Sequence, residues 1–189
     1  MYIGKKKIVK IITILFLLGC FLAGLKLNIL EKVLYPYPYR DIIERYAAEY
    51  GIDPLLVIAV IREESHFLPK SSSPKGAIGL MQLMPSTAKE IAGWLKEDYS
   101  QVDLKQPEDN IRYGTWYLAT LYKEFSGNTG LSLAAYNAGS GRVKGWLENS
   151  KKSSNSYLLK DIPFPETKEY VQKVLKSYNK YSELYGGKK

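Results

Sequence analysis

The feature that most constrains the fold of this sequence is the segment that follows Asp53, because it is apolar on every side. Aspartate is a favoured helix N-cap residue and proline is favoured at the first helical position, as in Asp53-Pro54. All seven residues from Leu55 to Ile61 are then apolar. A helix that is apolar all round must be buried. We therefore predict a helix from Pro54 to about Glu64 that lies in the core of the domain.

The rest of the chain beyond residue 40 also has helical periodicity, and no run alternates with period two for long enough to indicate a sheet. Asp109 is expected to cap the segment 111–125, and Gly139 and Gly141 are expected to turn the chain. Residues 149–165 are polar and contain proline, so we expect a loop. The sequence therefore predicts one all-α domain with helices at 40–50, 54–64, 85–95, 111–125, 131–138 and 166–185.

The first 35 residues differ from the rest. Four lysines between Lys5 and Lys10 precede Ile11–Leu25, which contains no charge. Counted from Ile8, the apolar run has eighteen residues interrupted only by Lys10, which is long for a signal peptide and just long enough to cross a bilayer. We predict an uncleaved, single-pass membrane anchor in residues 1–35. The lysines should stay in the cytoplasm, which places the helical domain, residues 36–189, on the extracytoplasmic side.

Two other interpretations of this segment stay open. Leu17-Leu18-Gly19-Cys20 resembles a lipoprotein processing site, although the apolar run continues through Leu25. A buried hydrophobic helix is the other alternative, although four lysines on one side make it less natural.

Charge and composition exclude several classes of function. The net charge is +8, but residues 1–35 hold six lysines against Glu31, which leaves only +3 for the remaining 154 residues. No dense basic stripe remains, so we expect no nucleic-acid partner. The chain has one cysteine, Cys20, and one histidine, His66. An intrachain disulfide and a Cys/His metal cluster are thus excluded, and we expect chemistry by carboxyl groups without a metal or other cofactor.

The predicted buried helix ends in two glutamates, Glu63 and Glu64. Val57, Val60 and Ile61 share the face of Glu64, because residues three, four and seven apart lie together on a helix. Burial disfavours the charged form of a carboxyl, so Glu64 should keep its proton near neutral pH and act as a general acid. The two glutamates are about 100° apart on the helix, so only one of them fits a given pocket. The same pair is also typical of a solvated helix end.

Two further segments have polar residues in unusual apolar settings. In residues 76–85, two glycines precede an apolar stretch that holds Gln82, which can both donate and accept hydrogen bonds. In residues 134–139, a run of small residues ends in Tyr136-Asn137. Taken singly, each segment also fits a structural role. Residues 76–85 would form a turn in the core, with methionine side chains filling gaps. Residues 134–139 would form a closely packed helix end. The chain also has sixteen tyrosines. Their flat aromatic rings with a hydroxyl group can bind sugar rings as well as pack in the core.

Together these segments resemble the catalytic domain of the soluble lytic transglycosylases, a goose-type lysozyme-like family. The resemblance covers about residues 40–180 and rests on four motifs in the family's order. These motifs are Glu64-Ser65, Gly79-Leu80-Met81-Gln82, Ala135-Tyr136-Asn137 and Tyr170. Ser140 stands where many relatives have proline, which touches no expected catalytic position.

The resemblance implies a lysozyme-like all-α domain that acts on peptidoglycan glycan strands. It implies that Glu64 protonates the β-1,4 bond between N-acetylmuramic acid and N-acetylglucosamine. The same residue then acts as a base while the C6 hydroxyl of the muramic acid closes a 1,6-anhydro ring. Tyr136 would orient or stabilise groups near Glu64. The substrate-binding residues would be Ser65, Met81, Gln82, Asn137 and Tyr170.

Two alternatives of function stay open from the sequence. One is a muramidase of the same fold that uses water, which Asp98, Asp103 or Asp109 would position. The other is a catalytically inert cell-wall-binding module, against which the intact Glu64 argues.

Overall fold

The computed structural model of the chain describes residues 4, 10, 13–18, 29–150 and 159–187. The chain divides into two compact units, residues 1–36 and 37–189. In the first unit, residues 13–18 are helical and their large apolar side chains are exposed. Most of the expected anchor, including Cys20, lies outside the described residues. Among the residues that are described, no helix is both long and apolar enough to cross a membrane.

The second unit is built from helices, as the sequence predicts. Within the described ranges the only β-type pairings are two isolated bridges, Ser72 with Ile78 and Ile78 with Leu83. The described residues of this unit form seven α-helices: α2 (Arg40–Tyr50), α3 (Pro54–Ser65), α4 (Pro85–Leu95), α5 (Pro107–Glu124), α6 (Thr129–Ala138), α7 (Ser140–Ser150) and α8 (Pro165–Tyr185). Two short 3-10 helices, η1 (Tyr99–Gln101) and η2 (Leu159–Asp161), also lie in the described part of the unit. The prediction of an all-α domain is confirmed.

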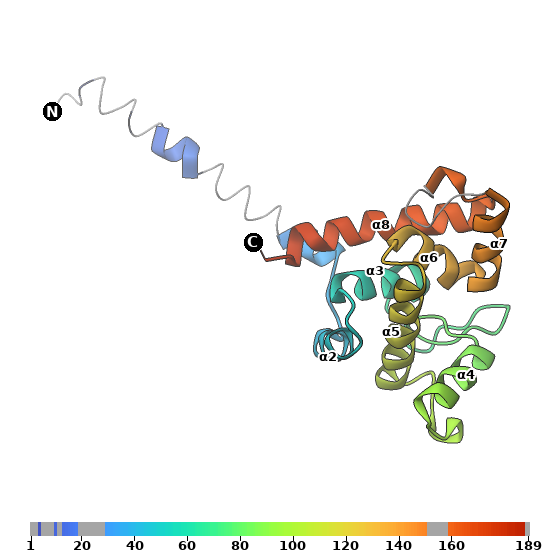
Figure 1. Cartoon of the computed structure of the whole chain (residues 1–189). Coiled ribbons are helices and arrows are strands. Elements are labelled where there is room, and N and C mark those ends of the chain that lie inside the picture. The colour runs from blue at the N-terminus through green and yellow to red at the C-terminus, as the bar shows by residue number, and fades with distance from the viewer. Residues whose placement is uncertain (1–3, 5–9, 11–12, 19–28, 151–158, 188–189) are drawn as a thin grey trace. The chain divides into compact units, whose positions relative to one another are not determined.

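The apolar helix α3 lies in the core, as predicted. The Asp53 carboxylate accepts a hydrogen bond from the backbone N–H of Leu55 at 2.8 Å, which caps the helix. Every side chain from Leu56 to Ile61 is buried. Helix α8 packs along α3, and α2 contacts it as well (Figure 1). Burial of the five larger side chains among them, all except Ala59, stabilises the fold strongly, because each contributes about 1.5–3 kcal/mol.

Helix α5 runs through the unit and contacts α2, α4 and α6 (Figure 1). Its most consequential residue is Asn110, which is fully buried. The Asn110 carbonyl oxygen accepts the backbone N–H of Met81 at 2.7 Å. Its amide nitrogen donates to the backbone carbonyls of Ile78 at 2.9 Å and Leu104 at 2.8 Å. One side chain on α5 thereby fixes the loop that leads into α4.

Two glycines allow this loop to lie directly against α5. Gly79 has φ +84°, and a Cβ atom there would lie 2.1 Å from the Asn110 amide nitrogen and 2.2 Å from the Leu104 carbonyl oxygen. A Cβ atom on Gly114 of α5 would lie 2.4 Å from the sulfur of Met81. Only glycine fits such contacts. At Gly79 the backbone of the loop therefore passes directly against Asn110 of α5 and the Leu104 carbonyl.

Two expectations about the helices are wrong. Helix α5 begins at Pro107 with Gln106 as its N-cap. Asp109 therefore lies inside the first turn, where its carboxylate accepts the backbone N–H of Asp103 at 2.9 Å. The proline at the first helical position, rather than the aspartate, marks the start.

The second wrong expectation concerns α7, because only a turn is predicted from the sequence in this segment. Two glycines inside α7, Gly141 and Gly145, give it weak helical propensity. Tertiary contacts supply the missing stability, since Val143 is fully buried and Lys144 pairs with Glu124 of α5.

The central role of Asn110 leads to a prediction. Asn110→Ala removes three hydrogen bonds and leaves their backbone partners buried, so the free energy of unfolding should fall by about 3 kcal/mol. Urea unfolding of the purified variant measures this loss. Asn179→Ala, a change at an exposed site on α8, is the control and should alter stability little. A loss below about 1 kcal/mol at Asn110 would show that the loop is held by other contacts.

Candidate active site

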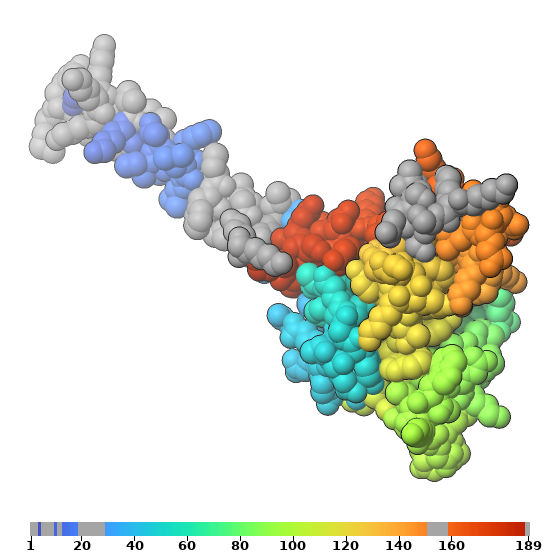
Figure 2. Space-filling view, in the orientation of Figure 1, coloured from blue at the N-terminus to red at the C-terminus, as the bar shows by residue number. Residues whose placement is uncertain are grey.

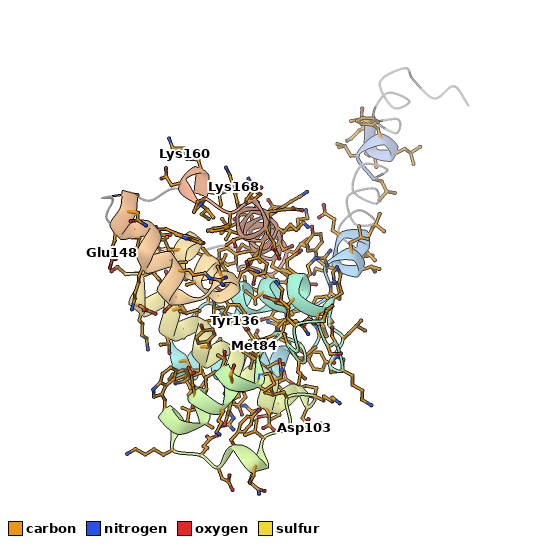
Figure 3. All side chains as sticks on the ribbon, turned by 90° about the vertical axis from the view of Figure 1, so that its right-hand side faces the viewer. Met84, Asp103, Tyr136, Glu148, Lys160 and Lys168 are labelled. Carbon is orange, nitrogen blue, oxygen red and sulfur yellow. The ribbon has the colours of Figure 1, made fainter. Side chains whose placement is uncertain are left out.

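A cavity of about 840 Å³ opens between the loop before α4, the end of α3, and helices α6, α7 and α8. Figure 2 shows the surface of α7, in orange, next to the green segment that precedes α4. In Figure 3, Met84 and Tyr136, which both line the cavity, lie close to one another near the middle of the domain. The lining also includes Glu64, Lys75, Gln82, Asn137, Arg142, Trp146, Phe164, Glu166 and Thr167.

Glu64 enters this cavity from the last turn of α3. The Tyr170 hydroxyl on α8 donates a hydrogen bond to its carboxylate at 2.7 Å. Burial raises the pKa of Glu64 to about 7; the hydrogen bond from Tyr170 opposes this rise, and the negative charge of Glu63 adds to it. Near neutral pH the carboxyl is therefore populated in both protonation states, so it can donate a proton and take one back.

Glu63 has different partners from Glu64 and does not line the cavity. The Ser177 hydroxyl on α8 donates to its carboxylate at 2.6 Å, and the Arg62 guanidinium lies 3.7 Å away. The two consecutive glutamates thus both face α8, at Ser177 and Tyr170, but only Glu64 borders the cavity. This agrees with the expectation that one of the two fits a pocket.

Tyr136 and Tyr170 both keep their phenolic protons. Burial raises the pKa of each well above 10, and the charge of Glu64 adds to the effect. The Tyr136 hydroxyl donates to the backbone carbonyl of Met81 at 2.8 Å, and its ring packs against Tyr117 with ring centres 5.4 Å apart. Tyr136 is therefore held firmly by the same loop that Asn110 fixes.

Gln82 and Asn137 place two amide groups on the cavity wall. The Gln82 amide nitrogen donates to the backbone carbonyls of Gly79 at 2.9 Å and Ser71 at 3.3 Å. The Asn137 side-chain oxygen accepts the hydroxyl proton of Thr167 at 2.9 Å. This contact turns the Asn137 amide so that its nitrogen is free to donate elsewhere.

Ser65 and Met81, two residues expected to bind substrate, have their side chains beneath the cavity rather than in its lining. Ser65 is buried, and its hydroxyl donates to the Ile61 carbonyl at 3.1 Å. The Met81 side chain is fully buried against α5, with its sulfur 4.0 Å from the Thr115 hydroxyl. Both are packing positions that support the residues in the lining.

Several lining residues were not expected from the sequence: Lys75, Met84, Arg142, Trp146, Phe164, Glu166 and Thr167. Trp146 of α7 packs against Phe164 with ring centres 5.4 Å apart, and the two form an aromatic wall. The only local signal for Glu166 and Thr167 is that they come just before Tyr170 on α8. Arg142 and Trp146 lie on α7, a helix that is not predicted from the sequence.

The three aspartates considered as residues that position a hydrolytic water instead accept hydrogen bonds from nearby backbone N–H groups. The Asp98 carboxylate accepts from the backbone N–H of Ser100 at 2.9 Å, and Asp103 accepts from that of Lys105 at 2.9 Å. Asp109 bonds to the backbone of Asp103. None of the three lines the cavity. In the part of the chain that the structure describes, no three His, Cys, Asp or Glu residues are grouped to hold a metal ion.

Comparison with known proteins agrees with this geometry. Residues 41–159 match the family described as the Transglycosylase SLT domain. The chain is 41% identical over 158 residues to the soluble lytic murein transglycosylase of Escherichia coli, an alignment that covers 82% of this chain and 24% of that protein. It is 32% identical over 170 residues to membrane-bound lytic murein transglycosylase C of Edwardsiella ictaluri, covering 78% of this chain and 47% of that protein.

The fold is also similar to a solved structure. The crystal structure of the 70 kDa soluble lytic transglycosylase of Escherichia coli superposes with a TM-score of 0.75 and 38% sequence identity. The superposition covers 82% of this chain and 26% of that protein. The chain thus spans about a quarter of the length of its soluble relatives.

The raised pKa of Glu64 predicts how stability depends on pH. Below pH 4.5 the carboxyl is protonated in the folded and the unfolded protein alike. Between pH 4.5 and 7 only the unfolded state loses the proton, so the free energy of unfolding should fall by up to about 3 kcal/mol and then stay level. Glu64→Gln should lack this decline in urea unfolding at pH 5 and pH 8.

Glu148→Gln, a change at an exposed carboxyl on α7, is the matched control and should keep the wild-type decline. If wild type and Glu64→Gln show the same difference between pH 5 and pH 8, Glu64 does not hold its proton in the folded state.

Proposed function

Because the chain belongs to the Transglycosylase SLT domain family, we propose that it is a lytic transglycosylase that cleaves the glycan strands of peptidoglycan. The observation that carries the proposal is Glu64, a carboxyl with a pKa of about 7 on the wall of an open cavity. Cleavage of a glycosidic bond needs such a group, because the leaving oxygen must be protonated as positive charge develops on the sugar ring.

The proposed reaction uses one carboxyl twice. Protonated Glu64 gives its proton to the oxygen of the β-1,4 bond between N-acetylmuramic acid and N-acetylglucosamine, and the bond breaks. The Glu64 carboxylate then takes the proton of the C6 hydroxyl, whose oxygen attacks C1 of the same muramic acid. The products are a free N-acetylglucosamine hydroxyl and a 1,6-anhydro end. Intramolecular attack needs neither a bound water nor a second carboxylate nucleophile.

The surrounding residues have separate roles in this proposal. Tyr170 orients the Glu64 carboxyl through its hydrogen bond and stabilises the charged form after proton transfer. Tyr136, held on the Met81 carbonyl, keeps a hydroxyl dipole near the reacting groups. Gln82 and Asn137 suit the N-acetyl groups of the sugars, because amides both donate and accept hydrogen bonds.

The test is a comparison of two adjacent residues. Glu64→Gln keeps the shape of the side chain but removes the transferable proton, so release of soluble fragments from purified peptidoglycan should fall at least ~10²-fold. Glu63→Gln, whose partner is Ser177, should lose far less. Equal losses in the two folded variants would contradict the role of Glu64.

Mass spectrometry of the wild-type products tests the reaction type in the same assay. An anhydro end is lighter than a hydrolysed end by one water, about 18 Da, because the intramolecular hydroxyl takes the place of water. Hydrolysed ends would identify a muramidase, and an absence of products would contradict the proposed cleavage of glycan strands.

We further propose that residues 1–35 anchor the protein in the cell membrane with residues 36–189 on the extracytoplasmic side. The lysines before the apolar run and the length of that run support this orientation. The full-length protein should sediment with membranes, and protease added to spheroplasts should digest its C-terminal part. Recovery of intact protein from the soluble cytoplasm would contradict the proposal. A mature protein that starts at a lipidated Cys20 would favour the lipoprotein alternative.

A further inference from the structure

Two tryptophan rings stack at the surface between α4 and α5, outside the cavity lining. Trp94 lies in the last turn of α4 and is 59% exposed, whereas Trp116 lies on α5 and is partly buried. Their ring centres are 5.3 Å apart, and the two ring planes differ by 29°. A single exposed apolar residue is common on a protein surface, but a stacked pair of indoles forms a flat apolar platform. We call these two residues the tryptophan platform.

The tryptophan platform also offers polar groups that have no protein partner. Within the described ranges, neither indole N–H donates a hydrogen bond to the protein, and the only buried polar side-chain atom without a partner is the Tyr37 hydroxyl. The N–H of Trp116 therefore reaches the surface. Glu90, four residues before Trp94, shares its face of α4, is exposed, and forms no ion pair with any residue that the structure describes. A ligand on the platform thus meets two donors and one acceptor.

The tryptophan platform is continuous with the aromatic surface of the cavity. Tyr117 follows Trp116 on α5 and packs against Tyr136, which lines the cavity, with ring centres 5.4 Å apart. Helices α4 and α5 contact one another (Figure 1). The rings of Trp116, Tyr117 and Tyr136 all pack against the same buried cluster, which consists of Leu83, Ala88, Ile91, Ala92, Leu104 and Tyr113. One long ligand can therefore contact both the cavity and the platform.

The small size of the platform disfavours a membrane or a second copy of the chain as its ligand. A tryptophan side chain buries about 150–250 Å² in a contact, so two of them supply less than the ~800 Å² per partner of a stable protein interface. The exposed charged residues Lys89, Glu90 and Lys96 flank Trp94 in the sequence and limit the apolar area further. An area of this size, with a few polar groups beside it, suits one sugar ring.

We propose that the tryptophan platform binds a pyranose ring of the glycan strand beyond the part of the strand that enters the cavity. This inference rests on the proposed function, because it concerns the substrate class of that reaction. The C–H groups on one side of a pyranose ring pack against the electron-rich face of an indole. The indole N–H groups donate to sugar hydroxyls, and the Glu90 carboxylate accepts from them. Stacking on Trp116 holds the Trp94 ring in place, so little side-chain entropy is lost on binding.

The experiment compares a short and a long ligand, with the full chain carrying Glu64→Gln so that neither ligand is cleaved. The short ligand is the disaccharide of N-acetylglucosamine, which is too short to span the cavity and the platform. The long ligand is a glycan strand from which an amidase has removed the peptides. Trp94→Ala should raise the Kd of the long strand about 3- to 10-fold, as expected for the loss of one aromatic stacking contact. The Kd of the disaccharide should change less than about twofold.

Two further variants test whether stacking on this ring is the cause. Trp94→Phe keeps an aromatic face and should keep the Kd of the long strand within about twofold of the parent value. Tyr185→Ala removes a ring that stacks on Tyr181 of α8, outside the cavity lining, and should leave both Kd values unchanged. If Trp94→Phe weakens binding as much as Trp94→Ala does, or if Tyr185→Ala has the same effect, the platform does not bind the strand by stacking and the proposal is overturned.

The remaining outcomes also decide the proposal. An unchanged Kd of the long strand in Trp94→Ala overturns it, and so does an equal loss for both ligands, because Trp94 would then act through the shape of the cavity. A dimer in sedimentation velocity that Trp94→Ala dissociates would assign the platform to a contact between copies and overturn it as well. Because binding is measured without turnover, the result is independent of the product analysis. A wild-type protein that releases no fragments but keeps the predicted binding pattern would refute the enzyme and not the glycan contact.

Discussion

The buried side-chain amide of Asn110 is the contact on which the floor of the site depends. Its three hydrogen bonds join α5 to the backbone at Ile78, Met81 and Leu104, so the loop before α4 has one fixed path. Met81 then presents its carbonyl to Tyr136. A polar group in the core lowers the stability of the fold when it has no hydrogen-bond partner. When all its hydrogen bonds are made, as at Asn110, it fixes one arrangement of the surrounding backbone.

The chemistry of Glu64 depends on a balance between the burial of its carboxyl and one hydrogen bond. Burial at the end of an apolar helix raises its pKa to about 7, and the hydrogen bond from the Tyr170 hydroxyl opposes that rise. The neighbouring contact of Glu63 with Ser177 fastens the same turn of α3 to α8. The two consecutive glutamates thus have different roles: Glu63 holds the end of α3 in place, and Glu64 faces the cavity.

The sequence predicts best where local chemistry and burial agree. Asp53 and Pro54 start α3 as expected, and the apolar run that follows is buried because no other environment suits it. Prediction fails where distant contacts decide. Helix α7 contains two glycines, which disfavour a helix, but it forms because Val143 is buried and Lys144 pairs with Glu124 of α5. The sequence does not show that Met81 packs under Gly114, so this residue was expected to contact substrate directly.

Residue types and their spacing were enough to predict an all-helical domain, a buried helix that ends in a glutamate, and the motifs that relate the chain to its family. These follow from periodicity, capping and residue type, which act over a few neighbouring positions. The side chains that contact one another across the domain are known only from the folded chain. Tyr170 reaches Glu64 across 106 positions of the chain, and Lys75 and Arg142 border the same cavity from different elements. Such contacts depend on how helices pack, and the packing is set by the whole core rather than by any one segment.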